Sequence, residues 1–337
     1  MPDPRNLVDA GTRHYGRFGA RPANVNPLDE FGGLTRVLRG LRLKEWIGFT
    51  LLHPDWYASL IMQDAHYLAS SEFYAYDRAR GALHQHAANA RGGSLGLPAD
   101  LLGGSRCAFR RGGYALAYEF AQASGRHRLR FDIAATAKAP AVSGELELDA
   151  AAATAPLSVS SRLPGGGRMY THKAVFPVEG TLRVGDAEVV FDGEHDLAIL
   201  DEHKSLLPYR TSWLWGTFAA PSAAGVVGAN FADRAEVPGE QEESCIWSPT
   251  AAEPLADITF TPESDDPAAP WRIRSADGRL DVLFEPEGRK VVEHQLGILA
   301  IDYFQAFGTY TGTLRTAGAT HTVSGVHGVC ESMRARL

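Results

Sequence analysis

The sequence contains few of the residues on which disulfide-rich and metal-binding proteins depend. Its 337 residues include three cysteines, Cys107, Cys245 and Cys330, which are far apart and form no C-x-x-C pair. An odd number of distant cysteines cannot complete a disulfide framework. Paired cysteine ligands are missing, and no His, Asp or Glu spacing is typical of a metal ligand set, so we expect no structural or catalytic metal.

Long apolar runs and basic patches are also missing. No stretch approaches the roughly 18 apolar residues that a bilayer-spanning helix needs, and residues 1–22 lack the apolar core of a signal peptide. We therefore expect a cytoplasmic protein without stable membrane insertion. Lys and Arg number 33 against 40 Asp and Glu, a net charge of −7, and no basic stripe is present, which disfavours nucleic-acid binding. The chain has no G-x-S-x-G elbow, so a serine hydrolase is not supported.

Short strand patterns separated by turn residues fill most of the chain. In residues 128–133, Leu129, Phe131 and Ile133 alternate with polar residues, the period of two that places one strand face in a core. The pairs Gly185-Asp186 and Asp277-Gly278 separate such runs and predict hairpins. Residues 310–315 and 320–324 are another expected hairpin. Many short strands joined by turns predict an all-β protein built as sandwiches or barrels.

The chain length and a weak internal repeat predict two halves. Trp46 and Phe49 are followed by Pro54, and Trp215 and Phe218 are followed by Pro221; this similarity can also arise by chance. Residues 1–35 are expected to form an irregular arm. A short helix is expected next, because Leu34, Val37, Leu38 and Leu41 recur at helical spacing. The predicted units are the arm 1–35, a first half 36–200 and a second half 201–337.

Residues 192–215 hold the densest group of side chains able to carry acid–base catalysis. Trp213 and Trp215, two residues apart, share one strand face and are expected to form an aromatic wall. A partly dry carboxylic acid beside such a wall has a raised pKa and can donate a proton. The alternative is a solvated turn without function. The acidic, basic and aromatic residues of this segment are His195, Asp196, Asp201, Glu202, His203, Lys204, Tyr209, Trp213 and Trp215.

Other candidate residues lie outside this segment. Tyr170 and His172 are expected to share one strand face, with Lys173 pointing to the other. Glu243 lies between two apolar runs. Glu331, near the end of the last expected strand, is either a solvated charge or a buried acid facing a barrel interior. Cys330 is expected to be a buried, inert thiol.

The chain resembles the bacterial DUF2804 family, which is described only as a domain of unknown function. The resemblance covers nearly the whole chain. It rests on Trp46, Asp64-Ala65-His66-Tyr67, Tyr170, Lys173, Asp201, Lys204, Pro208, Thr211, Trp213, Trp215, Asn230-Phe231, Glu243, Gly328, Cys330 and Glu331. That family is in turn similar to the double-lipocalin group, which includes carotenoid 1,2-hydratase, tocopherol cyclase, AttH-like proteins and fungal Diels–Alderases.

The resemblance implies two tandem lipocalin-like antiparallel β-barrels, with an apolar pocket at or near their junction. It also implies chemistry without a cofactor, such as proton-initiated hydration or cyclisation of alkenes. The hydratases have an Asp-His-x-Trp-like stretch where this chain has residues 201–204. Here the Trp is missing and the His is displaced by one position.

Two hypotheses follow. In the first, the protein is a cofactor-independent lyase, isomerase or cyclase acting on a hydrophobic, unsaturated molecule. Asp201 would be the general acid, with His203 as its orienter or base and Glu331 as a second acid. In an alternative role, Lys204 would pair with Asp201 and hold it ionised. Tyr170, His172, Lys173, Tyr209, Trp213, Trp215 and Glu243 would bind the substrate. In the second, the protein carries a lipid or terpenoid without transforming it. The sequence leaves the oligomeric state open.

Overall fold

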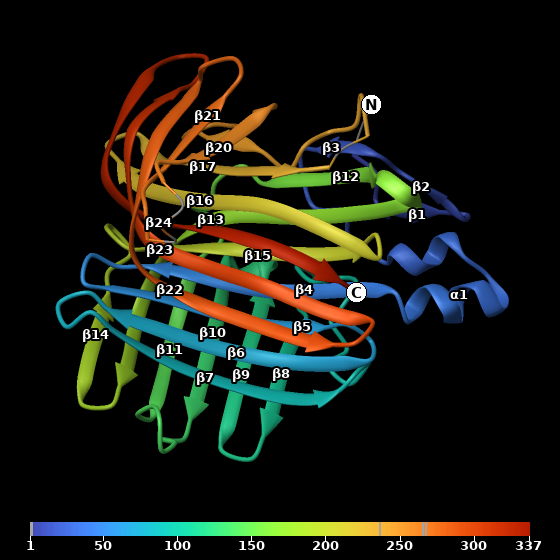
Figure 1. Cartoon of the computed structure of the whole chain (residues 1–337), viewed down its shortest axis with the longest axis horizontal. Helices are drawn as coiled ribbons and strands as arrows, with labels where there is room; N and C mark the ends of the chain where they lie inside the picture. The colour runs from blue at the N-terminus through green and yellow to red at the C-terminus, as the bar shows by residue number, and fades with distance from the viewer. Residues whose placement is uncertain (1–2, 236, 265, 267) are drawn as a thin grey trace.

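The protein is built almost entirely of antiparallel β-strands, as the sequence predicts (Figure 1). The computed structural model describes the whole chain except residues 1–2, 236, 265 and 267. In the described part, none of the helices has the length and apolar character that crossing a bilayer requires. The helical segments are short: η1 (Pro27–Glu30), α1 (Gly33–Gly40), η2 (Gln122–Ser124) and η3 (Pro164–Gly166).

The first half of the chain forms a curled sheet in which β13 is the central strand. The N-terminal part of β13 pairs with β15, and its C-terminal part, from Val178 to Val184, pairs with β11. The strands follow the order β7 (Ala82–Arg91), β6 (Leu68–Asp77), β5 (Trp56–Asp64), β4 (Leu43–Leu52), β15 (Leu197–Leu206), β13 (Gly167–Val184), β11 (Val142–Asp149), β10 (Arg126–Ile133), β9 (Tyr114–Ala121) and β8 (Arg106–Arg111). In addition, β12 (Leu157–Leu163) and β14 (Ala187–Phe191) pair with β13, and β3 (Gly16–Phe18) pairs with β12.

The second half forms a nine-stranded curled sheet. Its three longest strands, β22, β23 and β24, bend sharply and also lie across the first sheet (Figure 1). The nine strands of this sheet follow the order β19 (Ala252–Pro254), β18 (Cys245–Trp247), β17 (Gly225–Arg234), β16 (Arg210–Ser222), β24 (Thr320–Arg336), β23 (Leu299–Arg315), β22 (Leu280–Leu296), β21 (Trp271–Ser275) and β20 (Ile258–Pro262).

Local turn chemistry produces the hairpins that the sequence predicts. Val184 pairs with Ala187 across Gly185 and Asp186, and Arg315 pairs with Thr320 at the β23–β24 turn. In each half, the first long strand pairs with the last one: β4 with β15, and β16 with β24. The first sheet ends at Leu206 and the second begins at Arg210. The predicted boundary between residues 200 and 201 therefore falls inside β15.

The interior of each barrel is filled by side chains. In the first barrel, Phe49 packs edge-on against Tyr118, with ring centroids 5.0 Å apart. Both belong to a cluster of buried residues that come from ten strands of the sheet. In the second, Phe218, Phe284 and Tyr310 pack together. Side chains on successive strand residues point to opposite faces, so the other face of each sheet is available for contact between the barrels.

The two barrels meet through those outer faces. Tyr57 and Tyr76 from the first sheet pack against Phe307 of the second, and Trp247 and Val329 belong to the same buried cluster. The N-terminal arm, with β1 (Val8–Asp9) and β2 (Thr12–Arg13), packs on the first barrel around Tyr170. The barrel junction is therefore a third core, and it contains the candidate site.

A glycine at the bend of the second barrel provides a test of this packing. Gly308 in β23 lies between β22 and β24, and a Cβ added there would collide with the carbonyl oxygen of Glu285. Gly308→Ala should lower the free energy of unfolding by about 1–3 kcal/mol or more, the usual cost of overpacking. Gly318 has open space around its Cα, so Gly318→Ala should change stability by about 1 kcal/mol or less. Equal urea midpoints for the two variants would contradict the register described here.

Candidate active site at the barrel junction

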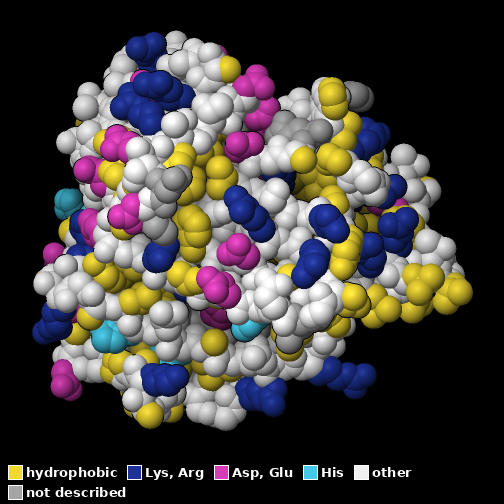
Figure 2. All heavy atoms as spheres, in the orientation of Figure 1, with side chains coloured by type: hydrophobic (Ala, Val, Ile, Leu, Met, Phe, Trp, Pro, Cys, Tyr) yellow, Lys and Arg dark blue, Asp and Glu magenta, His cyan; other side chains and the backbone are white. Residues whose placement is uncertain are grey.

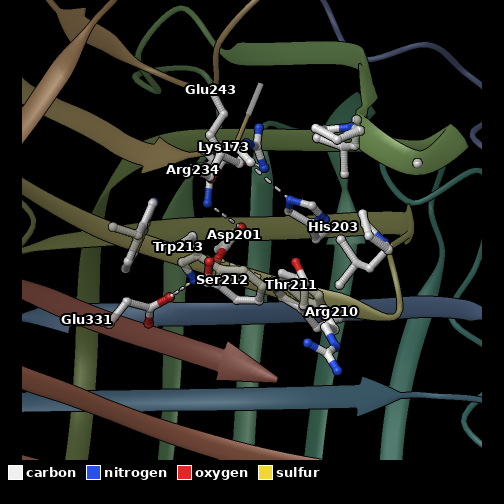
Figure 3. A pocket seen from close by; sticks show the side chains of 18 residues that line it. Lys173, Asp201, His203, Arg210, Thr211, Ser212, Trp213, Arg234, Glu243 and Glu331 are labelled. Atoms are coloured by element: carbon white, nitrogen blue, oxygen red, sulfur yellow. Dashed lines mark hydrogen bonds and ion pairs between the residues drawn. The ribbon is translucent and has the colours of Figure 1, made fainter. Parts of the chain in front are cut away.

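A pocket of about 230 Å³ lies between the outer faces of the two sheets (Figure 3). Strands β4, β13 and β15 of the first barrel form one side, and β16, β17 and β24 of the second form the other. The β15–β16 connection, η3, Leu163 at the end of β12, and Ala235 and Glu243 between β17 and β18 complete the lining. The pocket therefore depends on both halves of the chain.

Three aromatic rings are stacked along one wall of the pocket. Trp46 stacks on His203, with centroids 4.2 Å apart and planes inclined by 14°. Trp213 lies on the same wall, 6.5 Å from Trp46 and nearly parallel to it. Trp215 is nearby and donates from Nε1 to Asn230 Oδ1 at 3.0 Å. Indole faces of this kind attract positive charge, so the wall suits an apolar or cationic guest.

Asp201 forms an ion pair with Lys173. The two residues are register partners on β15 and β13, and Lys173 Nζ is 2.6 Å from Asp201 Oδ1. Trp46 Nε1 donates to Asp201 Oδ2 at 3.3 Å, and the Lys173 ammonium also lies over the Trp215 ring. Because an ion pair holds a carboxylate in its charged form, this geometry opposes the predicted role of Asp201 as general acid.

Glu331 is the second carboxyl group of the pocket, and its partners are neutral. It accepts hydrogen bonds from Trp213 Nε1 at 2.9 Å, Tyr303 Oη at 2.9 Å and Gln305 Nε2 at 2.8 Å. Among the described residues, no Lys, Arg or His forms an ion pair with it. Burial raises the pKa of Glu331, and the charge of Asp201 raises it further, although the three hydrogen bonds act in the opposite direction. The net shift is upward, which favours the protonated acid.

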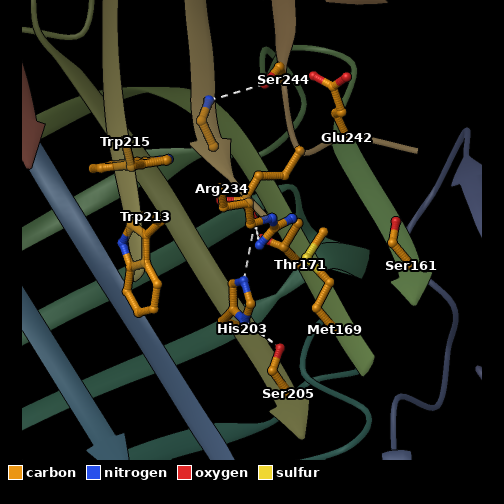
Figure 4. A network of polar contacts seen from close by, with 12 residues as sticks. Ser161, Met169, Thr171, His203, Ser205, Trp213, Trp215, Arg234, Glu242 and Ser244 are labelled. Carbon is orange, nitrogen blue, oxygen red and sulfur yellow. Dashed lines mark hydrogen bonds and ion pairs between the residues drawn. The ribbon is translucent and has the colours of Figure 1, made fainter. Parts of the chain in front are cut away.

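His203 is held by hydrogen bonds at both ring nitrogens (Figure 4). Nε2 lies 3.2 Å from Glu243 Oε2, and Nδ1 lies 2.7 Å from Ser205 Oγ. Arg234 Nη1 is 3.5 Å from the same Glu243 oxygen. Burial tends to raise the pKa of Glu243, but Arg234, Lys173 and His203 lower it well below its ordinary value. His203 therefore contacts Glu243 and Ser205 rather than orienting Asp201.

Lys204, a predicted catalytic residue, does not reach the pocket. Side chains alternate along β15, so Asp201 and His203 face the junction, whereas Glu202 and Lys204 face the other side. Lys204 Nζ pairs with Glu45 Oε1 at 2.7 Å. The suggestion that Lys204 holds Asp201 ionised is therefore corrected: the partner of Asp201 is Lys173.

Three predicted substrate-binding residues also lie outside the pocket. Tyr170 and His172 share a strand face opposite to Lys173, as predicted, but that face points away from the junction. The Tyr170 hydroxyl bonds Ser158 Oγ at 3.0 Å, and burial lowers the pKa of His172 to about 4. Tyr209 is 41% exposed, and its hydroxyl donates to the carbonyl oxygen of Ile298.

The pocket brings together Lys173, Asp201, His203, Trp213, Trp215, Glu243 and Glu331 from the predicted set. Sequence reasoning on candidate residues missed Trp46, although it belongs to the family motif, and also Arg234, Tyr303 and Gln305. Register could have identified Gln305, which is paired with Glu331 on the neighbouring strand. In the part of the chain that is described, no group of three or more His, Cys, Asp or Glu is arranged to hold a metal ion. Cys330 is buried, and burial raises the pKa of its thiol.

The fold and the site define a protein of two lipocalin-like barrels in tandem with a polar, aromatic-walled pocket between them. The chain belongs to the DUF2804 family, a domain of unknown function, whose model matches residues 23–337. It is similar to the solved structure of CghA with Sch210972, with a TM-score of 0.55 and 12% identity over 88% of each chain. It is also similar to a putative AttH from Nitrosomonas europaea, with a TM-score of 0.52 and 14% identity over 91% of this chain and 95% of that chain. A search of curated proteins found no match.

Removing Lys173 tests the ion pair at the centre of the site. Lys173→Met should lower the free energy of unfolding by about 3 kcal/mol near neutral pH, because it leaves the partly buried Asp201 without its counterion and removes one of the two cations that act on the buried Glu243. Part of that stability comes from Glu243, whose folded pKa is lowered. This contribution is present above the ordinary pKa of 4.5 and is lost as the pH falls below it, so the deficit should shrink in acid.

The matched control is Arg183→Met, which breaks the exposed pair between Arg183 and Glu188. Surface pairs contribute about 1 kcal/mol or less. Urea denaturation of both variants at neutral and acidic pH measures the difference. Similar losses in the two variants would contradict a buried Lys173–Asp201 pair.

Proposed function

We propose that the protein is a cofactor-independent enzyme that carries out acid–base chemistry on a small, largely apolar, unsaturated molecule, as a hydro-lyase, isomerase or cyclase. The observation that carries the proposal is that one pocket contains two carboxyl groups whose interaction partners differ in charge. Glu331 has only neutral partners and a raised pKa, whereas Asp201 is held by Lys173. A carboxyl group with a raised pKa close to a carboxylate held in an ion pair is an arrangement that general acid–base catalysis uses.

Glu331 is the proton donor in this proposal. Its proton goes to one carbon of the substrate double bond, the π electrons form the new C–H bond, and Glu331 is left as a carboxylate. The faces of Trp46 and Trp213 stabilise the resulting carbocation. The cation then loses a proton to the Asp201 carboxylate, which gives an isomer or a cyclised product. Alternatively, it takes up water, whose surplus proton goes to Asp201, which gives the hydrated product.

The lining supports a substrate with both apolar and polar parts. Trp46, Trp213 and Trp215 offer apolar surface, and Arg210 and Arg234 provide positive charge at the side of the second barrel. The volume of about 230 Å³ is below the roughly 300–1,000 Å³ of drug-sized ligand sites. A small molecule, or the reactive end of a longer one, therefore fits. The complex of CghA with Sch210972 supports the capacity of this double-barrel fold to bind an organic molecule.

Glu331→Gln should lower turnover by about a hundredfold or more, because loss of a general acid typically costs that much. The purified protein is incubated with apolar metabolite extracts in D₂O, and products are followed by mass spectrometry as hydrated species or deuterium-labelled isomers. The control is Glu293→Gln, at an exposed glutamate of β22, which should retain full activity. Turnover retained by a folded Glu331→Gln variant would refute the assignment.

The pH profile gives an independent test. Because burial raises the pKa of Glu331 above its ordinary value of 4.5, the protonated, active form persists to a higher pH than for an exposed glutamate. The value of kcat/KM should therefore fall as the pH rises through this pKa. Steady-state rates across the acidic and neutral range measure the fall. A profile that rises with pH throughout this range is incompatible with Glu331 as proton donor.

The alternative function is that of a carrier. One observation favours it: the charged groups Lys173, Asp201 and Glu243 already have partners within the protein, so the site needs no reaction to satisfy them. Solvent extraction of the purified protein followed by mass spectrometry distinguishes the two functions. A carrier returns its ligand without deuterium after incubation in D₂O, whereas the enzyme returns a labelled product.

A further inference from the structure

The apolar face of α1 is uncovered. The sequence predicts this helix from the spacing of four apolar residues, and the helix is present, but their side chains are exposed by 55–74%. These residues are Leu34, Val37, Leu38 and Leu41. No residue of α1 is buried. An amphipathic helix normally buries this face, so the exposed stripe requires a partner outside the described chain.

Further exposed apolar side chains lie at the same end of the molecule. Leu43 follows α1 and pairs with Leu206, the last residue of β15. The β15–β16 connection, which contains Tyr209, therefore begins at the same end of the molecule as α1. The Tyr209 hydroxyl bonds Ile298 at the β22–β23 turn. Lys44 lies over the ring of Tyr67, next to Leu68. Of the ten large apolar side chains exposed in the described chain, eight are in this group: Leu34, Val37, Leu38, Leu41, Tyr67, Leu68, Tyr209 and Ile298, which we call the apolar end.

Basic side chains surround the apolar end, although the chain as a whole has a net charge of −7. Arg39, Arg42, Arg91 and Arg210 are exposed there, and none of them forms an ion pair with a described residue. Figure 2 shows hydrophobic side chains gathered over α1, with Lys and Arg side chains beside them. The exposed acids at this end include Glu293 and Asp302, which face each other on the β22–β23 hairpin.

The pocket opens toward this end. Its exposed lining residues are Gly165, Arg210, Ser212 and Ala235. Gly165 belongs to η3, Arg210 and Ser212 to the start of β16, and Ala235 follows β17. Arg42, two residues after α1, donates from Nη2 to the carbonyl oxygen of Leu207 at 2.9 Å, and Leu207 also lines the pocket. This hydrogen bond joins the segment that follows α1 to the β15–β16 connection, which lines the pocket.

We propose that the apolar end docks on the surface of an anionic lipid bilayer and brings the pocket mouth to the membrane. The apolar side chains enter the boundary between the headgroups and the acyl chains, and the arginines bind lipid phosphates. Interfacial helices usually bind membranes through these two kinds of contact. A symmetric dimer through this end would bring Arg39, Arg42 and Arg210 of one copy against the same charges of the other, which is unfavourable. A bilayer therefore fits the surface better than a second copy. This inference concerns delivery of an apolar ligand and holds for an enzyme or a carrier.

Vesicle cosedimentation of the full chain tests the proposal. The protein should bind vesicles of phosphatidylcholine with about one-third phosphatidylglycerol, and bind pure phosphatidylcholine vesicles several-fold less, because the arginines need anionic lipid. Val37→Gln should weaken binding by about five- to tenfold. Val190→Gln is the matched control, since Val190 is exposed by 61% against 63% for Val37 but lies on β14, away from α1 (Figure 1). It should bind like the unaltered protein.

Light scattering on the same samples measures whether the chain self-associates. Binding to anionic vesicles that Val37→Gln weakens and Val190→Gln does not supports the proposal. Three outcomes overturn it: no binding to either type of vesicle, equal weakening by the two valine variants, or a dimer that Val37→Gln dissociates without any vesicle binding.

Discussion

The ion pair between Lys173 and Asp201 gives the two carboxyl groups of the junction pocket different chemistry. Strand register places Lys173 directly beside Asp201, which leaves Glu331 with only an indole, a phenol and an amide as partners. A desolvated charge without an ion-pair partner is costly, so desolvation raises the pKa of Glu331 and favours its protonated form. The proposed division into proton donor and charge stabiliser depends on this asymmetry.

The junction also explains why the protein has two barrels. Each barrel interior contains a cluster of buried hydrophobic side chains. The pocket lies where the outer faces meet, and residues of both sheets are needed to close it. The indole of Trp213 and the ring of Trp46 come from different barrels and stack on one another, which couples the aromatic wall to correct docking of the two halves.

Much of the fold could be predicted because it is local. Turn pairs such as Gly185-Asp186 set hairpins by themselves, and period-two alternation identified strands. The same alternation places Lys173 on the strand face opposite to Tyr170 and His172, and it places Lys204 on the face opposite to Asp201. Tyr303, Gln305 and Arg234 were missed because their approach to the pocket depends on pairing between strands distant in sequence. The helical spacing of apolar residues predicted α1. Spacing alone, however, does not reveal that the apolar face of this helix is exposed in the folded chain.

The protonation state of Glu331 is the property on which the account rests most directly. Side-chain ¹³C carboxyl NMR of the glutamate-labelled protein, with Glu331→Gln used to assign the resonance, follows this group alone as the pH changes. The raised pKa of Glu331 predicts a titration midpoint above the ordinary 4.5. A midpoint at or below 4.5 would contradict it, because Glu331 would then be a carboxylate under conditions in which the proposed reaction requires an acid.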